Sequence, residues 1–96
     1  MSATAVHVVA MGPERFGVQV TEGDTTTSHE MHVQTDVLDA LGLSDDGAER
    51  VVRETFAFLL EREPATSILR TFSLADVSRY FPEFPDELRT RLAGAG

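Results

Sequence analysis

The sequence predicts an α+β fold, because the spacing of its apolar residues changes along the chain. The first third alternates apolar and polar side chains, as a strand with one buried face does. From Thr35 onward the apolar residues recur at helical spacing. Five of the six phenylalanines and the only tyrosine lie between residues 51 and 85. Since aromatic side chains are the largest apolar groups that a small chain can bury, we expect the core to close around this segment.

Three strands are predicted in the first third of the chain. The first is the valine-rich run that starts at His7, and the second is the alternating run 16–20. The third follows a turn at 22–24 and runs through three threonines to Gln34. Turns this short join strands into an antiparallel meander. Alternation predicts that the inward-facing side chains of the second and third strands are Phe16, Val18, Val20, His29, Met31 and Val33, and that Glu30, His32 and Gln34 face outward.

Two helices are predicted after the meander. The first is short and lies within residues 35–43, with Thr35 as N-cap and Gly42 as its left-handed terminator. The second is long, over residues 47–63, and the small and acidic residues 44–46 are expected to cap it. The apolar residues of this long helix cover an arc of roughly 200°. Such an arc is too wide for a helix that lies on one surface, so we expect the helix to be sandwiched between the meander and the C-terminal segments.

The last third of the chain is expected to pack on the long helix. Residues 65–72 form either a helical turn or an extended link. Ser73 and Asp76 have capping-box spacing and predict the start of a helix. Pro85 suits the first position of the last helix. The result is one domain over residues 1–96, frayed at 1–4 and 93–96, with a three-stranded antiparallel β-meander, a long central helix and two or three short helices.

The composition narrows the classes of function. The 96 residues carry a net charge of −8, all eight basic residues are arginine, and there is no cysteine. Disulfides and thiolate metal sites are therefore excluded. An acidic surface repels phosphate backbones, so nucleic acid is an unlikely partner. No run approaches the ~20 apolar residues of a membrane span. With no basic leader at the N-terminus, the sequence predicts a cytoplasmic protein without a membrane partner.

Metal, cofactor and catalytic sites are not expected. His29 and His32 are close in sequence, but on a strand they face opposite sides, and His7 is the only other histidine. Ser28 is next to His29, but these neighbours also face apart, so they do not form a nucleophile and base pair. The glycines do not have the spacing of a phosphate-binding loop. We therefore predict a protein that is not an enzyme and that has no cofactor.

The predicted function is that of a soluble, acidic, non-catalytic protein-interaction module, with a basic protein partner or a second copy of the chain. The segment 78–85 holds three aromatic residues and two prolines and could be a recognition strip. The favoured interpretation is that Phe81 and Phe84 instead close the end of the core, because a small domain has few aromatic residues to spare. The candidate interaction residues are Arg79, Tyr80, Arg50 and Arg53.

A DNA-binding regulator is the alternative. Residues 30–60 loosely resemble the ribbon-helix-helix repressors and antitoxins, in which paired strands of a dimer enter the major groove. The resemblance implies outward-facing groups at Glu30, His32 and Gln34, where that family usually presents basic or amide side chains. The discriminating feature is the distribution of arginine, because DNA binding requires one basic face. The arginines that would form such a face are Arg50, Arg53, Arg70 and Arg79.

The C-terminal half carries a second resemblance. Between Phe56 and Leu88, and most distinctively at residues 61–64 (Glu-Arg-Glu-Pro) and 79–82 (Arg-Tyr-Phe-Pro), the chain resembles a family of short uncharacterised bacterial proteins, mainly from actinobacteria. The resemblance implies no activity, ligand or partner.

Overall fold

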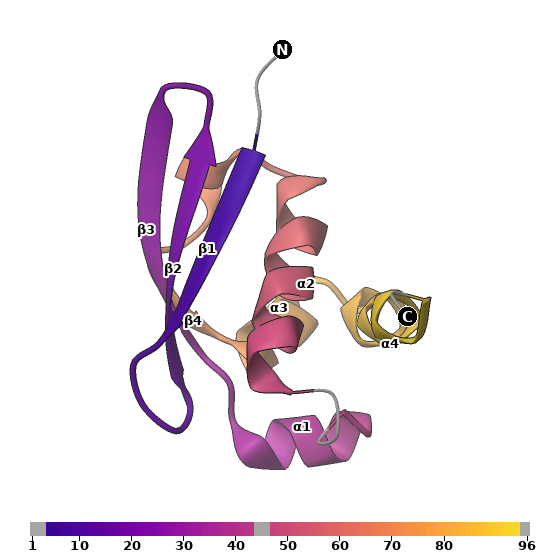
Figure 1. The fold of residues 1–96 in the computed structure, drawn as a ribbon. Helices are drawn as coiled ribbons and strands as arrows, with labels where there is room; N and C mark the ends of the chain where they lie inside the picture. The colour runs from indigo at the N-terminus through magenta and orange to yellow at the C-terminus, as the bar shows by residue number, and fades with distance from the viewer. Residues whose placement is uncertain (1–3, 44–46, 95–96) are drawn as a thin grey trace.

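The computed structural model describes residues 4–43 and 47–94 and shows an α+β fold (Figure 1). The predicted antiparallel meander is present, but it is part of a larger sheet with the strand order β1-β2-β3-β4. The first three strands pair antiparallel and the fourth pairs parallel to β3. The strands are β1 (Thr4–Ala10), β2 (Arg15–Glu22), β3 (Thr25–His32) and β4 (Thr71–Ser73).

The fourth strand corrects the prediction of three strands. Residues 65–72 were expected to form a turn or a link, and β4 lies at the end of that segment. It has only three residues, and its partners are the last three residues of β3, with Met31 opposite Phe72. The N–H of Glu30 also donates to the carbonyl of Arg70 at 2.6 Å. A strand this short has no periodicity of its own, so only the contact with a distant segment defines it.

The alternation along β2 and β3 is confirmed. Phe16, Val18 and Val20 of β2 are buried, and so are His29 and Met31 of β3. These side chains form the inner face of the sheet, and helices α2, α3 and α4 lie on that side (Figure 1). The helical elements are α1 (Thr35–Leu41), α2 (Ala48–Leu60), the 3-10 turn η1 (Ala65–Ser67), α3 (Leu74–Tyr80) and α4 (Phe84–Gly94).

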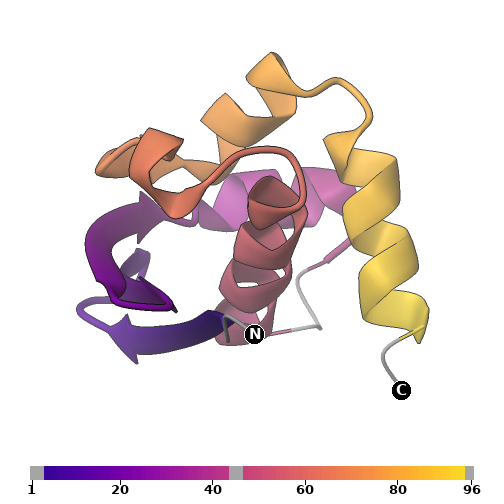
Figure 2. The same ribbon diagram turned by 90° about the horizontal axis from the view of Figure 1, so that it is seen from above.

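Helix α2 lies between the sheet and α4, as Figures 1 and 2 show. On the sheet side, the ring of Phe56 is 5.6 Å from that of Phe72 and 5.4 Å from that of His29. On the other side, the ring of Phe58 is 4.9 Å from that of Phe84. Both α2 phenylalanines are 0% exposed. The prediction of a sandwiched central helix is confirmed.

The bounds of the central helix differ from the prediction. The helix begins at Ala48 and ends at Leu60, three residues before the predicted end. The N–H groups of Arg62 and Glu63 both donate to the carbonyl of Leu59 at 3.0 Å, so the last predicted turn is a tighter terminal turn. At the start, Gly47 is the N-cap, with φ of 81° and no side-chain cap. The capping residues predicted at 44–46 lie outside the described residues.

The cap of α1 comes from a distant residue, which corrects the prediction that Thr35 is the N-cap. Gln34 holds the N-cap position without a side-chain cap bond. The Glu14 carboxylate, in the loop between β1 and β2, instead accepts hydrogen bonds from the N–H and the hydroxyl of Thr35, both at 2.7 Å. At the other end the predicted terminator is confirmed, because Gly42 has φ of 73°. The Glu14 bonds tie the first hairpin to α1.

These two bonds stabilise the charged form of Glu14. The N–H of Thr35, then its hydroxyl, hold the pKa of the Glu14 carboxyl below its ordinary value of 4.5, and His32 adds a smaller effect of the same sign. The unfolded chain has no such bonds. The resulting stabilisation is therefore present above pH 4.5 and is lost as the pH falls through the lower pKa of the folded state.

The C-terminal helices follow the predicted signals. Ser73 and Asp76 form a complete capping box at the start of α3, with bonds of 3.1 and 3.2 Å. Helix α4 begins at Phe84, one residue before Pro85.

At the ends of the described chain, β1 starts at Thr4 and α4 runs to Gly94. The other residues of the predicted frayed ends, 1–3 and 95–96, are not among those that the structure describes. Within 4–43 and 47–94, no helix has the length and apolarity that crossing a membrane requires.

The two-sided burial of α2 predicts the effect of truncating Phe56. The variant Phe56→Ala should lower the free energy of unfolding by about 3–5 kcal/mol, because it leaves a cavity between α2 and the sheet. Urea titration followed by circular dichroism measures the change. The exposed Leu69→Ala is the control, and its effect should stay within about 0.5 kcal/mol. An unchanged urea midpoint for Phe56→Ala would contradict the sandwiched position of α2.

The lowered pKa of Glu14 predicts a pH-dependent effect. Glu14→Gln should be less stable than the parent at pH 7, and the difference should vanish as the pH falls through the lower pKa of the folded state, since the parent then also loses the charge. Thermal melts between pH 3 and pH 7 measure the difference. Asp24→Asn, in the exposed turn after β2, is the matched control. A Glu14→Gln deficit of the same size at every pH would show that the charge is not responsible.

Candidate functional site

The structure contains an apolar groove of about 400 Å³ on the helical side of the molecule. Three segments border it: the end of α2, the link from η1 to β4, and α3. The volume is within the range of about 300–1,000 Å³ that is usual for ligand pockets. The apolar side chains that line its interior are Leu59, Ile68, Phe72, Val77 and Phe81.

Two large apolar side chains stand exposed at the rim of this groove. Leu69 is 55% exposed and Tyr80 is 69% exposed. They are two of the four exposed large apolar side chains in the described part of the chain. Single exposed apolar residues are common, but two that flank one apolar groove are typical of an interaction surface. A partner that filled the groove would remove both from water.

Two carboxylates also border the groove. Asp76 is already engaged, because it belongs to the α3 capping box and lies 3.8 Å from a guanidinium nitrogen of Arg79. Glu63 is half-buried beside the groove. Among residues 4–43 and 47–94, no hydrogen bond or ion pair involves its carboxylate. Glu63 is therefore the acid at this rim that is available to a cation on a bound partner.

A buried histidine positions the Leu69 part of the rim. The Nδ1 of His29 lies 2.8 Å from the carbonyl oxygen of Leu69. A carbonyl can only accept, so Nδ1 carries the proton. In the neutral ring, Nε2 then accepts from the hydroxyl of Thr27, which lies 2.8 Å away. The ring also packs on Phe56, so one inward-facing side chain of β3 connects the core to the groove.

The predicted interaction residues do not lie together. Tyr80 lines the groove, and Arg79, beside it on α3, pairs with Asp76. Arg50 and Arg53 are on α2 and contact other elements. The guanidinium of Arg50 donates to the carbonyl of Leu92 in α4 at 2.7 Å, and that of Arg53 donates to the carbonyl of Val6 in β1 at 3.4 Å. Only Tyr80 of the four predicted residues belongs to the groove.

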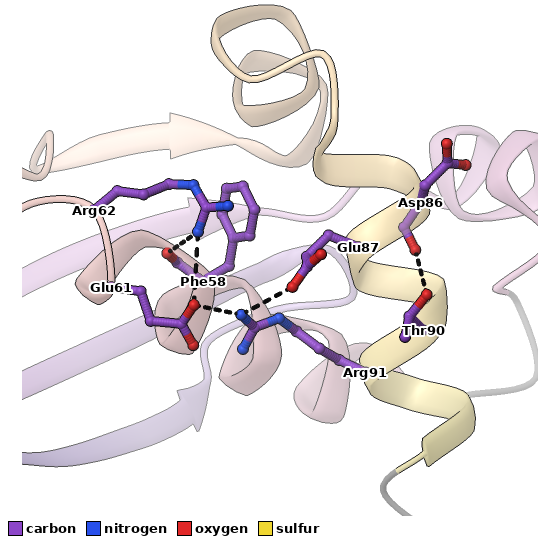
Figure 3. A network of polar contacts seen from close by, with 7 residues as sticks. All are labelled: Phe58, Glu61, Arg62, Asp86, Glu87, Thr90 and Arg91. Atoms are coloured by element: carbon purple, nitrogen blue, oxygen red, sulfur yellow. Dashed lines mark hydrogen bonds and ion pairs between the residues drawn. The ribbon is translucent and has the colours of Figure 1, made fainter.

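Two further arginines, Arg62 and Arg91, lie where α4 packs on α2 (Figure 3). The Arg62 guanidinium lies 3.6 Å from the centre of the Phe58 ring, and Arg91 lies 5.8 Å from it. Arg91 also donates to Glu61 at 2.7 Å and to Glu87 at 3.2 Å. The hydrogen bond between Arg91 and Glu61 lowers the pKa of the Glu61 carboxyl and raises the pKa of the Arg91 guanidinium. These arginines are dispersed among acids and do not form a basic face.

Sequence reasoning missed Leu69 and Glu63. Leu69 follows Ile68, and the backbone at Ile68 is extended, with φ of −75° and ψ of 134°. In an extended segment adjacent side chains point to opposite sides. Ile68 is buried and Leu69 is exposed, as that rule requires. The pair of adjacent apolar residues was therefore a usable signal, whereas nothing local marks Glu63 as different from its acidic neighbours.

The histidines have separate roles. His29 faces the core, and His32 faces outward, where its Nε2 lies 2.9 Å from Glu30. The prediction that these two histidines face opposite sides is confirmed. In the described part of the chain, no group of three or more histidine, aspartate or glutamate side chains is placed to hold a metal ion.

A scan against protein-family models, a search of curated proteins and a search of solved structures each found no match to this chain. Only the geometry of the groove therefore indicates a function.

The contact between His29 and Leu69 predicts a stability effect. His29→Leu should lower the free energy of unfolding by about 1–3 kcal/mol, because the Leu69 carbonyl loses its donor. Urea titration measures the change. Thr27→Val is the matched control, since it removes the partner of Nε2 and leaves the bond from Nδ1 in place, so its effect should be smaller. Equal stability of His29→Leu and the parent would contradict the anchoring role.

Proposed function

We propose that the protein is a non-catalytic interaction module, and that the groove beside α3 binds a short apolar segment of a basic protein. The observation that carries the proposal is one apolar groove with three features at its rim. Two are the exposed apolar side chains of Leu69 and Tyr80, and the third is the available carboxylate of Glu63. Interaction surfaces commonly consist of an apolar centre with a polar or charged rim.

The charge of the chain supports a basic partner. The net charge is −8, and the two titratable residues that border the groove, apart from Tyr80, are acids. A Lys or Arg next to the inserted apolar residue would lie near Glu63, so the partner segment should have one or two large apolar residues with a basic residue close by. Charge complementarity of this kind raises the rate of association and makes it sensitive to salt.

The size of the groove supports a weak and reversible complex. A volume of about 400 Å³ accommodates one or two large side chains and not a folded surface. Contacts that bury much less than ~1,200 Å² in total are typical of transient complexes. The binding energy should depend on Tyr80 and Leu69, because rigid aromatic and apolar side chains at the centre of an interface contribute most of it.

The ribbon-helix-helix alternative has less support. It requires a strand that pairs with the same strand of a second copy. Here β3, the strand that precedes α1, pairs with β2 along its whole length and with β4 at Glu30, Met31 and His32. Of the four arginines that would form a basic face, Arg50 contacts α4, Arg53 contacts β1 and Arg79 pairs within α3, and Arg70 lies in the link before β4. A basic face of the kind that DNA binding needs does not arise from these positions.

Peptide selection tests the proposal. A phage-displayed library of random peptides should yield sequences with one or two large apolar residues next to Lys or Arg. In a titration of one selected peptide, Leu69→Glu and Tyr80→Ala should each weaken binding by about tenfold or more. Glu63→Gln should weaken binding less and should reduce its dependence on salt.

Two further variants are controls for this titration. Val9→Ser, on β1 and outside the groove, should leave the affinity unchanged. Arg79→Ala removes a positive charge next to the groove and should leave the affinity unchanged or raise it. Enrichment of acidic peptides, or binding that Leu69→Glu and Tyr80→Ala do not affect, would contradict the proposal.

A further inference from the structure

Strand β1 is an edge strand without the features that usually protect such an edge. It is the first strand in the order β1-β2-β3-β4, so among residues 4–43 and 47–94 one side of its backbone has no strand partner. Natural edge strands are commonly protected by charged residues, proline, bulges or short length. The seven residues of β1, TAVHVVA, contain no proline and no Lys, Arg, Asp or Glu, and the pairing with β2 is continuous without a bulge.

The pairing with β2 defines which backbone groups of β1 face the open side. The N–H of Met11 donates to the carbonyl of Arg15 at 2.8 Å. In an antiparallel ladder, pairs that exchange hydrogen bonds alternate with pairs that do not. Odd-numbered residues of β1 therefore bond to β2, and even-numbered residues direct their N–H and C=O groups away from it. In the interior of the strand these residues are Val6, Val8 and Ala10.

A contact from α2 agrees with this assignment. The guanidinium of Arg53 reaches the carbonyl of Val6 at 3.4 Å. That carbonyl is one of those assigned to the open side. The distance is long for a hydrogen bond, so the contact is weak. No such contact is present at Val8 or Ala10 within the described residues.

We propose that β1 pairs with β1 of a second copy of this chain, antiparallel and centred on Val8. The three open positions are self-complementary about that centre, because Val8 faces Val8 of the second copy and Val6 faces Ala10. In each of these pairs the N–H and C=O groups of both strands point toward the other copy, and only the Val6 carbonyl has a contact within its own chain, the weak one from Arg53. A two-fold axis through Val8 would join the two sheets into one sheet of eight strands.

The side chains fit the same register. On the outer face of the sheet, Val9 would lie opposite His7 of the second copy, and Met11 opposite Ala5. Val9 is 62% exposed and Met11 is 51% exposed, and they are the other two exposed large apolar side chains of the described residues. Directly opposite side chains are in contact across an antiparallel pair. The pairing would therefore cover part of Val9 and Met11, which the single copy leaves in water.

The charges close to this edge do not oppose the pairing. Two copies with a net charge of −8 each repel one another. At the β1 edge no carboxylate would oppose another, because His7 is the one titratable side chain of the strand. Arg53 and Glu49 lie 3.9 Å apart on α2 and carry opposite charges. A short strand pair buries less than the ~1,200 Å² of a stable complex, so the dimer should be weak.

Sedimentation equilibrium tests the pairing. The parent should pass from monomer to dimer as the concentration rises to about 1 mM, the weak end of measurable affinities. Val9→Lys should weaken the dimer by about tenfold or more, because charge on an edge strand opposes strand addition. Leu69→Lys is the matched control, since it adds the same charge at another exposed apolar residue outside β1, and it should change dimerisation less. Arg53→Ala should strengthen the dimer by freeing the Val6 carbonyl.

Cross-linking tests the register. The chain has no cysteine, so single cysteines can be added at exposed positions. An oxidised mixture of His7→Cys and Val9→Cys should form a disulfide between the two variants, because opposite residues of such a pair lie about 4.5 Å apart. His7→Cys alone should cross-link more slowly, since its two copies would lie about 7–8 Å apart on the diagonal.

Three results would overturn the proposal. The first is a parent that remains monomeric at about 1 mM. The second is a dimer that Leu69→Lys disrupts and Val9→Lys does not, which would assign self-association to the groove. The third is cross-linking of His7→Cys alone that is as fast as that of the mixture, which would exclude the register centred on Val8.

Discussion

The burial of α2 on two opposite sides is the constraint on which the rest of the structure depends. Phe56 packs against the sheet and Phe58 packs against α4, and neither has any exposed surface. A helix that is apolar around more than half of its circumference needs partners on both sides. The C-terminal helices therefore have a structural role, because without them Phe58 would be exposed to water. The groove beside α3 lies at the end of α2, where Leu59 forms part of its lining.

The features that were predictable from the sequence are local. Alternation in β2 and β3, the terminator at Gly42 and the capping box at Ser73 each depend on residues within a few positions of one another. The features that were missed depend on contacts between distant segments. Strand β4 pairs with residues about forty positions earlier, and Glu14 caps a helix that starts 21 residues later. The end of α2 was also inaccurate, because its last predicted turn closes on the carbonyl of Leu59 instead of continuing the helix.

The candidate site was predictable only in part. Tyr80 was predicted as an interaction residue, and it stands exposed at the rim of the groove. Arg50 and Arg53 were also predicted as interaction residues, and they lie outside the groove. Their partners, a carbonyl of α4 and a carbonyl of β1, come from segments whose positions no local pattern gives. A groove between three segments is likewise a property of the packing, which is why its rim at Leu69 was not anticipated.

Amide hydrogen exchange along the chain tests the central claim most directly, because it measures the stability of each element separately. If both sides of α2 are buried, the amides around Phe56 and Phe58 exchange only through global unfolding, and the free energy derived from their exchange equals the free energy of unfolding from urea titration. Exchange of these amides through a local opening, at a smaller free energy than for the amides of β2, would contradict the account. In that case α2 would be a peripheral element, and the sheet alone would form the stable core.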